Sequence, residues 1–264
     1  MTKPESVGRE VLYEVIEGHV GLVRLNRPDK RNAVNGDVAE ALDWIVKETE
    51  RDPEVRAVIL TSSSTEFFCA GADLSEISKG RGHLLATKDG GFAGFTQHPR
   101  EKPWIAGVVG AGLAGGCEIA LACDMIVASD TARFGLPEVK RGLFAGAGGV
   151  FRLPRKLPAA IALELIATGD PLDAPRAYAL GLVNRMVPAS EVQAECVALA
   201  KAIAVNAPLS VRESLKVARL AHELPESELW AISRKVSAMV FASEDAREGP
   251  IAFLEKRAPV WKGR

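Results

Sequence analysis

The chain has 264 residues, of which 47% are hydrophobic and 25% are charged, and its formal net charge at pH 7 is -1. This length allows one large hydrophobic core, and so small a net charge creates no overall field that would attract nucleic acid or an anionic membrane. We therefore expect neither as a partner, and an anionic ligand must be met by local basic groups.

The cysteines favour a reducing compartment. Cys69, Cys117, Cys123 and Cys196 form no C-x-x-C pair, and three of them lie among apolar or small residues, where cysteine usually behaves as a small hydrophobic side chain. Residues 1–11 lack the apolar segment of a signal peptide, and no apolar run approaches the roughly 20 residues of a membrane span. We expect a cytoplasmic protein.

The first part of the chain predicts alternating strands and helices. Residues 11–17 and 19–25 alternate apolar and polar side chains around Gly18, which predicts a β-hairpin. Asp37 is expected to cap a helix from residue 38 to about 51. The pattern then predicts a strand at 55–61, a turn at 62–64, strand-like residues at 67–69, and a helix that begins at Asp73 or Ser75.

Residues 79–103 break this pattern. They include five glycines, several charged residues and two histidines, with no clear period. Such a segment is typical of a long functional loop, and we expect a mobile loop with a short helix that covers the substrate.

The second part of the chain ends in helices. Strands are predicted at 105–109, 125–129, 132–135 and 183–187, and helices at 117–123, 148–153, 158–169 and 173–180, with a glycine-rich loop at 142–149. Beyond residue 190 the pattern is helical throughout, with expected caps at Ser190, Ser210, Ser227 and Ser243. We therefore predict an α/β core over residues 1–190 and a helical region over 191–264.

The most informative stretch is 109–124, where a glycine-rich segment leads into an apolar helix that carries one carboxylate, Glu118. A glutamate in such a helix is costly unless it has a partner or a task. A helix that begins at Gly115 has unpaired N–H groups at its N-terminus, which is also the positive end of the helix dipole. Glu118 lies close to this end. There, an N–H could polarise a carbonyl oxygen while Glu118 moves protons on the adjacent carbons, with a second donor in the turn 69–72.

Other interpretations of this stretch have weaker support. Gly110-x-Gly112-x-x-Gly115 satisfies a dinucleotide-binding fingerprint, but Asp124 follows Gly115 by only nine residues instead of about 20. An NAD site therefore ranks behind the first interpretation. The four histidines show no ligand spacing, so we expect no metal, and the absence of G-x-S-x-G gives no support to a serine hydrolase of the elbow type.

A second carboxylate, Glu138, follows Pro137 in a predicted helical turn. A glutamate in a first turn commonly does no more than favour the helix dipole. Spacing alone leaves open whether Glu138 approaches Glu118.

Four blocks of sequence, 26–33, 68–74, 115–124 and 134–149, together resemble the crotonase (enoyl-CoA hydratase/isomerase) superfamily, nearly from end to end. Residues 91–95 and 248–264 are similar to its carnitinyl-CoA dehydratase branch. The resemblance implies an α/β fold made of a crotonase-like spiral of ββα units. It also implies a C-terminal helical region for oligomerisation, which builds a homotrimer or a dimer of trimers.

The resemblance further implies an oxyanion hole made by the N–H groups of Ala72 and Gly115, which would hold the thioester carbonyl of an acyl-CoA substrate. Glu118 and Glu138 match two glutamates that hold and activate one water in hydratases. The implied reaction is therefore the reversible hydration of a 2-enoyl-CoA. No cofactor is implied, because coenzyme A is part of the substrate.

The residues implied to contact the CoA portion are Lys30, Arg31, Ala70, Asp73 and, from a neighbouring subunit, Lys256. Ala114 replaces the first of three glycines usual in the family, and we expect this to be tolerated because the donor Gly115 is kept. Fatty enoyl-CoA and carnitinyl-CoA both remain open as substrates. An isomerase acting on a 3-enoyl-CoA and a non-catalytic acyl-CoA-binding protein are the remaining alternatives.

Overall fold

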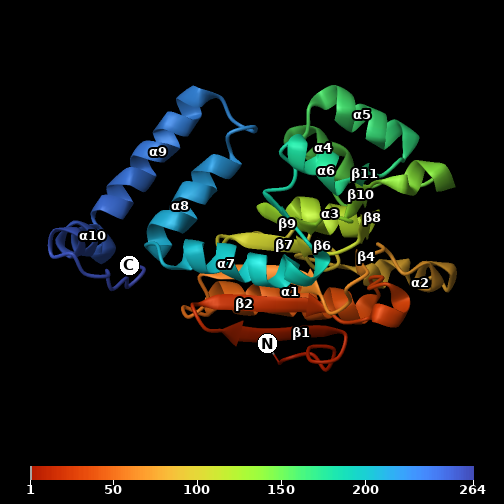
Figure 1. Cartoon of the computed structure of the whole chain (residues 1–264), viewed down its shortest axis with the longest axis horizontal. Helices are drawn as coiled ribbons and strands as arrows, with labels where there is room; N and C mark the ends of the chain where they lie inside the picture. Colours follow the sequence, from red (N-terminus) through yellow and green to blue (C-terminus); the bar gives the residue numbers. More distant parts are fainter. Residues whose placement is uncertain (1) are drawn as a thin grey trace.

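The computed structural model describes residues 2–264 and is built around a six-stranded sheet in the order β1-β2-β3-β7-β9-β12 (Figure 1). The first two strands form the predicted antiparallel hairpin, and all later neighbours run parallel. The strands are β1 (Val11–Ile16), β2 (Val20–Leu25), β3 (Ala57–Ser62), β7 (Trp104–Val108), β9 (Met125–Ser129) and β12 (Arg185–Val187).

A second sheet has four short strands in the order β11-β10-β8-β4. They are β4 (Phe67–Cys69), β8 (Ala111–Leu113), β10 (Arg133–Gly135) and β11 (Leu172–Asp173). Strands β4, β8 and β10 follow β3, β7 and β9 along the chain and pair with one another in parallel. Each turn of the chain thus adds one strand to each sheet and then a helical segment, which confirms the predicted spiral of ββα units.

The helices follow the strands and then continue alone to the C-terminus (Figure 1). They are α1 (Gly36–Arg51), α2 (Leu74–Ser78), α3 (Gly115–Ala122), α4 (Gly149–Lys156), α5 (Ala159–Thr168), α6 (Ala174–Ala179), α7 (Val192–Ala204), α8 (Pro208–Arg219), α9 (Glu226–Phe241) and α10 (Glu244–Leu254). Shorter elements are η1 (Pro28–Lys30), η2 (Gly82–Leu85), η3 (Pro137–Arg141), η4 (Ala189–Glu191), β5 (Ala86–Thr87) and β6 (Gly91–Phe92). Within residues 2–264 no single helix is long and apolar enough to cross a membrane. The helical segments 189–204 and 208–219 reach that length and apolar content only when taken together, and the chain bends by 105° between them.

Both faces of the large sheet are buried at its central strands β3 and β7. Along β3, Val58 and Leu60 join the core that includes α1 and α3, whereas Ala57 and Ile59 join the core on the side of α7. Successive side chains of a strand point to opposite faces, so a strand covered on both sides is apolar throughout. The sheet is therefore a rigid support for the segments at its edge.

Helix α7 belongs to this core, although it lies beyond residue 190. Val192, Cys196 and Ala200 recur every four residues and are buried against the sheet. Helices α8, α9 and α10 then extend away from it (Figure 1). The division at residue 190 stays a prediction, but the helices that leave the sheet begin at α8.

Several predicted helix caps are wrong. Asn35 caps α1 in place of Asp37, since its Oδ1 accepts the N–H of Val38 at 2.9 Å. Ser243 caps α10 as predicted, by accepting the N–H of Ala246 at 3.1 Å. The other predicted caps lie inside helical turns: Ser190, Ser210 and Ser227. Helices α8 and α9 begin earlier because a proline fixes the backbone at each start.

The segment 79–103 is packed more tightly than predicted. Leu85, Ala93 and Phe95 are buried in the main core, and a Cβ added at Gly94 would lie only 2.1 Å from the carbonyl oxygen of Ala39 in α1. Here glycine permits close packing against a helix. The expected short helix is present as η2, whereas the expectation of a mobile loop does not fit the buried residues that follow it.

Candidate active site

The glycine-rich segment before α3 forms a strand instead of a phosphate-binding turn. Gly112 lies in β8, between β4 and β10. Gly110 has φ +57°, and a Cβ there would lie 1.7 Å from the carbonyl oxygen of Glu66. Both glycines serve strand packing, so the dinucleotide-binding interpretation does not hold.

The start of α3 lies directly against the turn that follows β4. A Cβ at Gly116 would lie 2.0 Å from the carbonyl oxygen of Cys69, and one at Gly71 would lie 2.9 Å from the nitrogen of Gly115. Within residues 2–264 the N–H groups of Ala72 and Gly115 donate to no acceptor. The two predicted donors are thus brought together, at the positive end of a helix, where they can hold a developing oxyanion.

An aromatic ring that the sequence analysis did not place in the site lies over this helix start. A Cβ at Gly115 would lie 2.5 Å from Cε1 of Phe92, which belongs to β6. The ring is half-buried and contacts the main core. Phe92 therefore forms a wall of the site beside the Gly115 N–H.

Glu118 lies one turn further along α3 and is 3% exposed. Its Oε1 accepts the N–H of Gly149 at 2.9 Å. Burial raises the pKa of Glu118 to about 7, and the nearby Glu138 adds to this increase, whereas the N–H groups of Gly149 and Ala147 and the guanidinium of Arg152 oppose it. A Cβ at Gly149 would lie 2.7 Å from Cδ2 of Leu136 and 3.1 Å from Cγ of Glu118, so a larger residue there would press on both side chains.

Glu138 lies in η3, directly after β10. Its Oε2 is buried and has no hydrogen-bond partner within residues 2–264, and burial raises the pKa of Glu138. Leu136, two residues before Glu138, lies beside Glu118: a Cβ at Gly149 would come within 2.7 Å of Cδ2 of Leu136 and 3.1 Å of Cγ of Glu118. The charge of Glu138 also raises the pKa of Glu118. The structure thus brings together two glutamates whose meeting the sequence left open.

This arrangement can move protons in both directions. Two neighbouring carboxylates with raised pKa values favour a state in which one is protonated and the other is ionised. The ionised group can accept a proton from water while the protonated group donates one to carbon. The buried Oε2 of Glu138 is free to take part, and Gly115 lies roughly 5 Å along the helix axis from Glu118.

Three of the residues predicted to contact the CoA portion lie together. The N–H of Ala70 donates to the carbonyl of Arg31 at 3.0 Å, and the Arg31 guanidinium lies over the ring of Phe67, 5.2 Å from its centre. Lys30 is the exposed neighbour in η1. These residues border the turn that carries Ala72, so they are placed to meet a ligand that enters there.

The other two predicted CoA contacts are placed differently. Asp73 accepts the N–H of Ser75 at 3.0 Å as the cap of α2 and pairs with Arg27 at 3.3 Å. Burial opposes ionisation of Asp73, but these two partners hold its pKa below the usual value. Lys256 follows α10, far from α3 and β4 within one chain (Figure 1).

Comparisons with known proteins agree with this geometry. Residues 15–264 match the sequence profile of the enoyl-CoA hydratase/isomerase family. The carnitinyl-CoA dehydratase of Proteus mirabilis (strain HI4320) is 40% identical over 258 residues, which cover 96% of this chain and 98% of that protein.

Solved structures are similar over the same length. An enoyl-CoA hydratase from Mycobacterium tuberculosis H37Rv has a TM-score of 0.92 and 42% identity, covering 97% of this chain and 99% of that one. A carnitinyl-CoA hydratase from Mycobacterium avium has a TM-score of 0.78 and 47% identity, with the same coverage.

Proposed function

This chain belongs to the enoyl-CoA hydratase/isomerase family and is a hydro-lyase, and from this premise we propose that it adds water reversibly to a 2-enoyl-CoA thioester. The observation that carries the proposal is the pair of carboxylates beside the start of α3. Glu118 is fixed by the Gly149 N–H, whereas the buried Oε2 of Glu138 has no partner within residues 2–264 and is available to a water.

The substrate is held through its thioester carbonyl. The carbonyl oxygen accepts hydrogen bonds from the N–H groups of Ala72 and Gly115, and the dipole of α3 favours the negative charge that develops there. One such donor typically contributes about 10²–10³ to the rate. Because both donors are backbone groups on packed segments, no reorganisation is needed when the charge appears.

Water is then added across the double bond. The ionised glutamate accepts a proton from water as the water oxygen bonds to the β-carbon, and the electron pair of the double bond shifts toward the thioester oxygen. The protonated glutamate gives its proton to the α-carbon as that oxygen returns to a carbonyl. The two glutamates have exchanged protonation states, so the reverse sequence removes water from the product.

A second candidate is the dehydration of carnitinyl-CoA, which uses the same groups on an acyl chain that bears a quaternary ammonium. The names of the relatives from Proteus mirabilis and Mycobacterium avium support it. Phe92 also places an aromatic ring beside the helix start, and aromatic rings attract quaternary ammonium groups.

The test is a side-by-side assay of the purified chain with crotonyl-CoA and crotonobetainyl-CoA, following the ultraviolet absorbance of the conjugated thioester. The proposal expects this absorbance to fall with at least one substrate, and the ratio of the two kcat/KM values assigns the acyl group. Binding of both esters without turnover would reject the hydratase, and conversion of a 3-enoyl-CoA alone would indicate an isomerase.

We also propose that the chain forms a homotrimer or a dimer of trimers. Helix α9 has no buried residue, and Phe241, Phe253 and Leu254 are 78%, 82% and 79% exposed. An apolar surface of this kind marks an interaction site. In such an assembly Lys256, next to this surface, could reach the CoA of a neighbouring subunit. Light scattering of the purified protein tests this, and a monomeric mass would reject it.

A further inference from the structure

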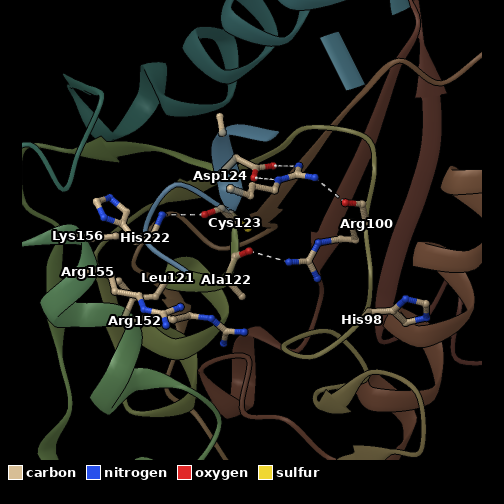
Figure 2. A pocket seen from close by; sticks show the side chains of 12 residues that line it. His98, Arg100, Leu121, Ala122, Cys123, Asp124, Arg152, Arg155, Lys156 and His222 are labelled. Carbon is tan, nitrogen blue, oxygen red and sulfur yellow. Dashed lines mark hydrogen bonds and ion pairs between the residues drawn. The ribbon is translucent and has the colours of Figure 1, made fainter. Parts of the chain in front are cut away.

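A separate cavity of about 460 Å³ lies at the C-terminal end of α3 (Figure 2). The eight residues of α3 place this end roughly 12 Å from Gly115, and none of the proposed oxyanion or glutamate residues lines the cavity. Five cationic side chains line it, against the single carboxylate of Asp124. They are Arg100, Arg152, Arg155, Lys156 and Arg219.

The carboxylate of Asp124 is already occupied by Arg219. The Nε and Nη2 atoms of Arg219 donate to the two oxygens of Asp124 at 2.8 and 2.9 Å, and Asp124 also accepts the N–H of Trp104 at 2.8 Å. A bidentate pair of this geometry satisfies both partners. Asp124 therefore compensates one of the five cations and no more.

Two further cations donate to backbone carbonyls and not to a carboxylate, and the guanidinium of Arg100 also lies over the ring of Phe95, 4.1 Å from its centre. Arg100 donates to the carbonyl of Ala122 at 2.6 Å, and Nζ of Lys156 donates to that of Cys123 at 3.0 Å. These carbonyls end α3, where the helix dipole favours a cation. They carry only partial charges, however, and the Lys156 ammonium has three donors of which one is used.

The remaining two cations are also poorly compensated. Arg152 donates to the carbonyls of Ala147 and Thr96 and has no carboxylate ion-pair partner within residues 2–264. Arg155 pairs with Glu223 at 3.2 Å, but both side chains are 48% exposed, so this pair is weak.

The cations also repel one another. Burial lowers the pKa of Arg100 and of Lys156, and the nearby guanidinium of Arg152 lowers both further. Figure 2 shows side chains from α3, α4 and the segment before β7 gathered around one space, with the ring of His222 beside Lys156. The cavity therefore collects positive charge that the protein itself does not cancel.

We propose that this cavity binds a small oxyanion that carries about two negative charges, and specifically free inorganic phosphate. Guanidinium and ammonium groups are the side chains that bind phosphate oxygens, by charge-assisted hydrogen bonds. The volume admits phosphate with its water. Neither Glu118 nor Glu138 lines the cavity, and Arg152 is the lining residue whose charge also acts on Glu118.

The experiment is a calorimetric titration of the full chain with inorganic phosphate at constant ionic strength, in the presence of saturating CoA. CoA fills the substrate site, so phosphate that binds under these conditions occupies another place. The proposal expects saturable binding of one phosphate per chain.

Three variants locate this site. Arg155→Gln should weaken phosphate binding about tenfold or more, because it removes a charge-assisted hydrogen bond to the phosphate. Glu223→Gln should strengthen it, because it frees Arg155, and general damage to the fold would not produce that gain. Arg176→Gln is the matched control: Arg176 lies on α6, outside the cavity, and is half-exposed opposite Glu164.

Absence of saturable binding would overturn the proposal. So would loss of phosphate binding when CoA is added, since the phosphate would then have occupied the CoA site. Equal effects of Arg155→Gln and Arg176→Gln would also overturn it, because they would indicate a general effect of surface charge.

Discussion

Replacing Glu118 by glutamine measures how strongly the fold disfavours an ionised carboxylate at this position. Glu118 is 3% exposed, and burial raises its pKa from 4.5 to about 7. Glutamine has nearly the same shape, and its amide oxygen can still accept the N–H of Gly149. The change therefore removes a titrating group and little else.

The direction of the effect follows from proton linkage. Between pH 4.5 and about 7 the folded protein keeps a proton on Glu118 that the unfolded chain has lost. The free energy of unfolding therefore decreases as pH rises through this window. The contribution of the protonated Glu118 is fully present below the window and lost above it. A shift of this size corresponds to about 3 kcal/mol at 1.36 kcal/mol per pKa unit.

The assay is denaturant unfolding of the parent chain and of Glu118→Gln at about pH 5 and about pH 8, at one protein concentration. The free energy of unfolding of the variant, relative to that of the parent, should be about 2.5 kcal/mol higher at pH 8 than at pH 5. Glu40→Gln, at an exposed position of α1, is the control and should show no such gain. If the stabilities of Glu118→Gln and the parent change in parallel, the carboxylate is not held in the environment described.

Three further changes test the backbone of the site and the outer surface. Ala114 has φ +51° and ψ -128°, a backbone conformation that costs a residue with a side chain about 1–3 kcal/mol. Ala114→Gly should therefore raise the free energy of unfolding by about 1 kcal/mol. An unchanged or lower value in denaturant unfolding would contradict this. Gly116→Ala places a Cβ 2.0 Å from the carbonyl oxygen of Cys69. We therefore expect the free energy of unfolding to fall by about 1–3 kcal/mol and kcat/KM to drop clearly. A stable, fully active variant would show that the contact is dispensable. Phe253→Ser combined with Leu254→Ser should reduce the mass measured by light scattering, and an unchanged assembly would place the subunit interface elsewhere.

The sequence predicts Glu118 better than Glu138, for a physical reason. A carboxylate in a short helix that is apolar on every side is visible from local pattern alone. The meeting of the two glutamates depends on the parallel pairing of β10 with β8, where Phe134 lies opposite Gly112. That register brings the chain before Glu138 beside the strand that leads into α3, and no local period encodes it.

Other parts of the site are decided by contacts between distant segments. Phe92 lies in a strand of two residues, too short to show a period, and its place over Gly115 depends on how residues 79–103 pack on α1. The positive φ of Ala114 is equally hidden, because alanine gives no local sign of it. Strand β8 was missed since its glycines favour a loop interpretation.

The most direct test of the central claim compares hydration rates of the parent chain, Glu118→Gln, Glu138→Gln and the double variant on the preferred enoyl-CoA. Each single change should lower kcat/KM by about 10²–10⁴, and the double variant should lose little more, because the two glutamates act as a unit. Binding of the CoA ester should persist in all four proteins. A single variant that hydrates at the parent rate would contradict the account, because the paired glutamates would not then perform the reaction.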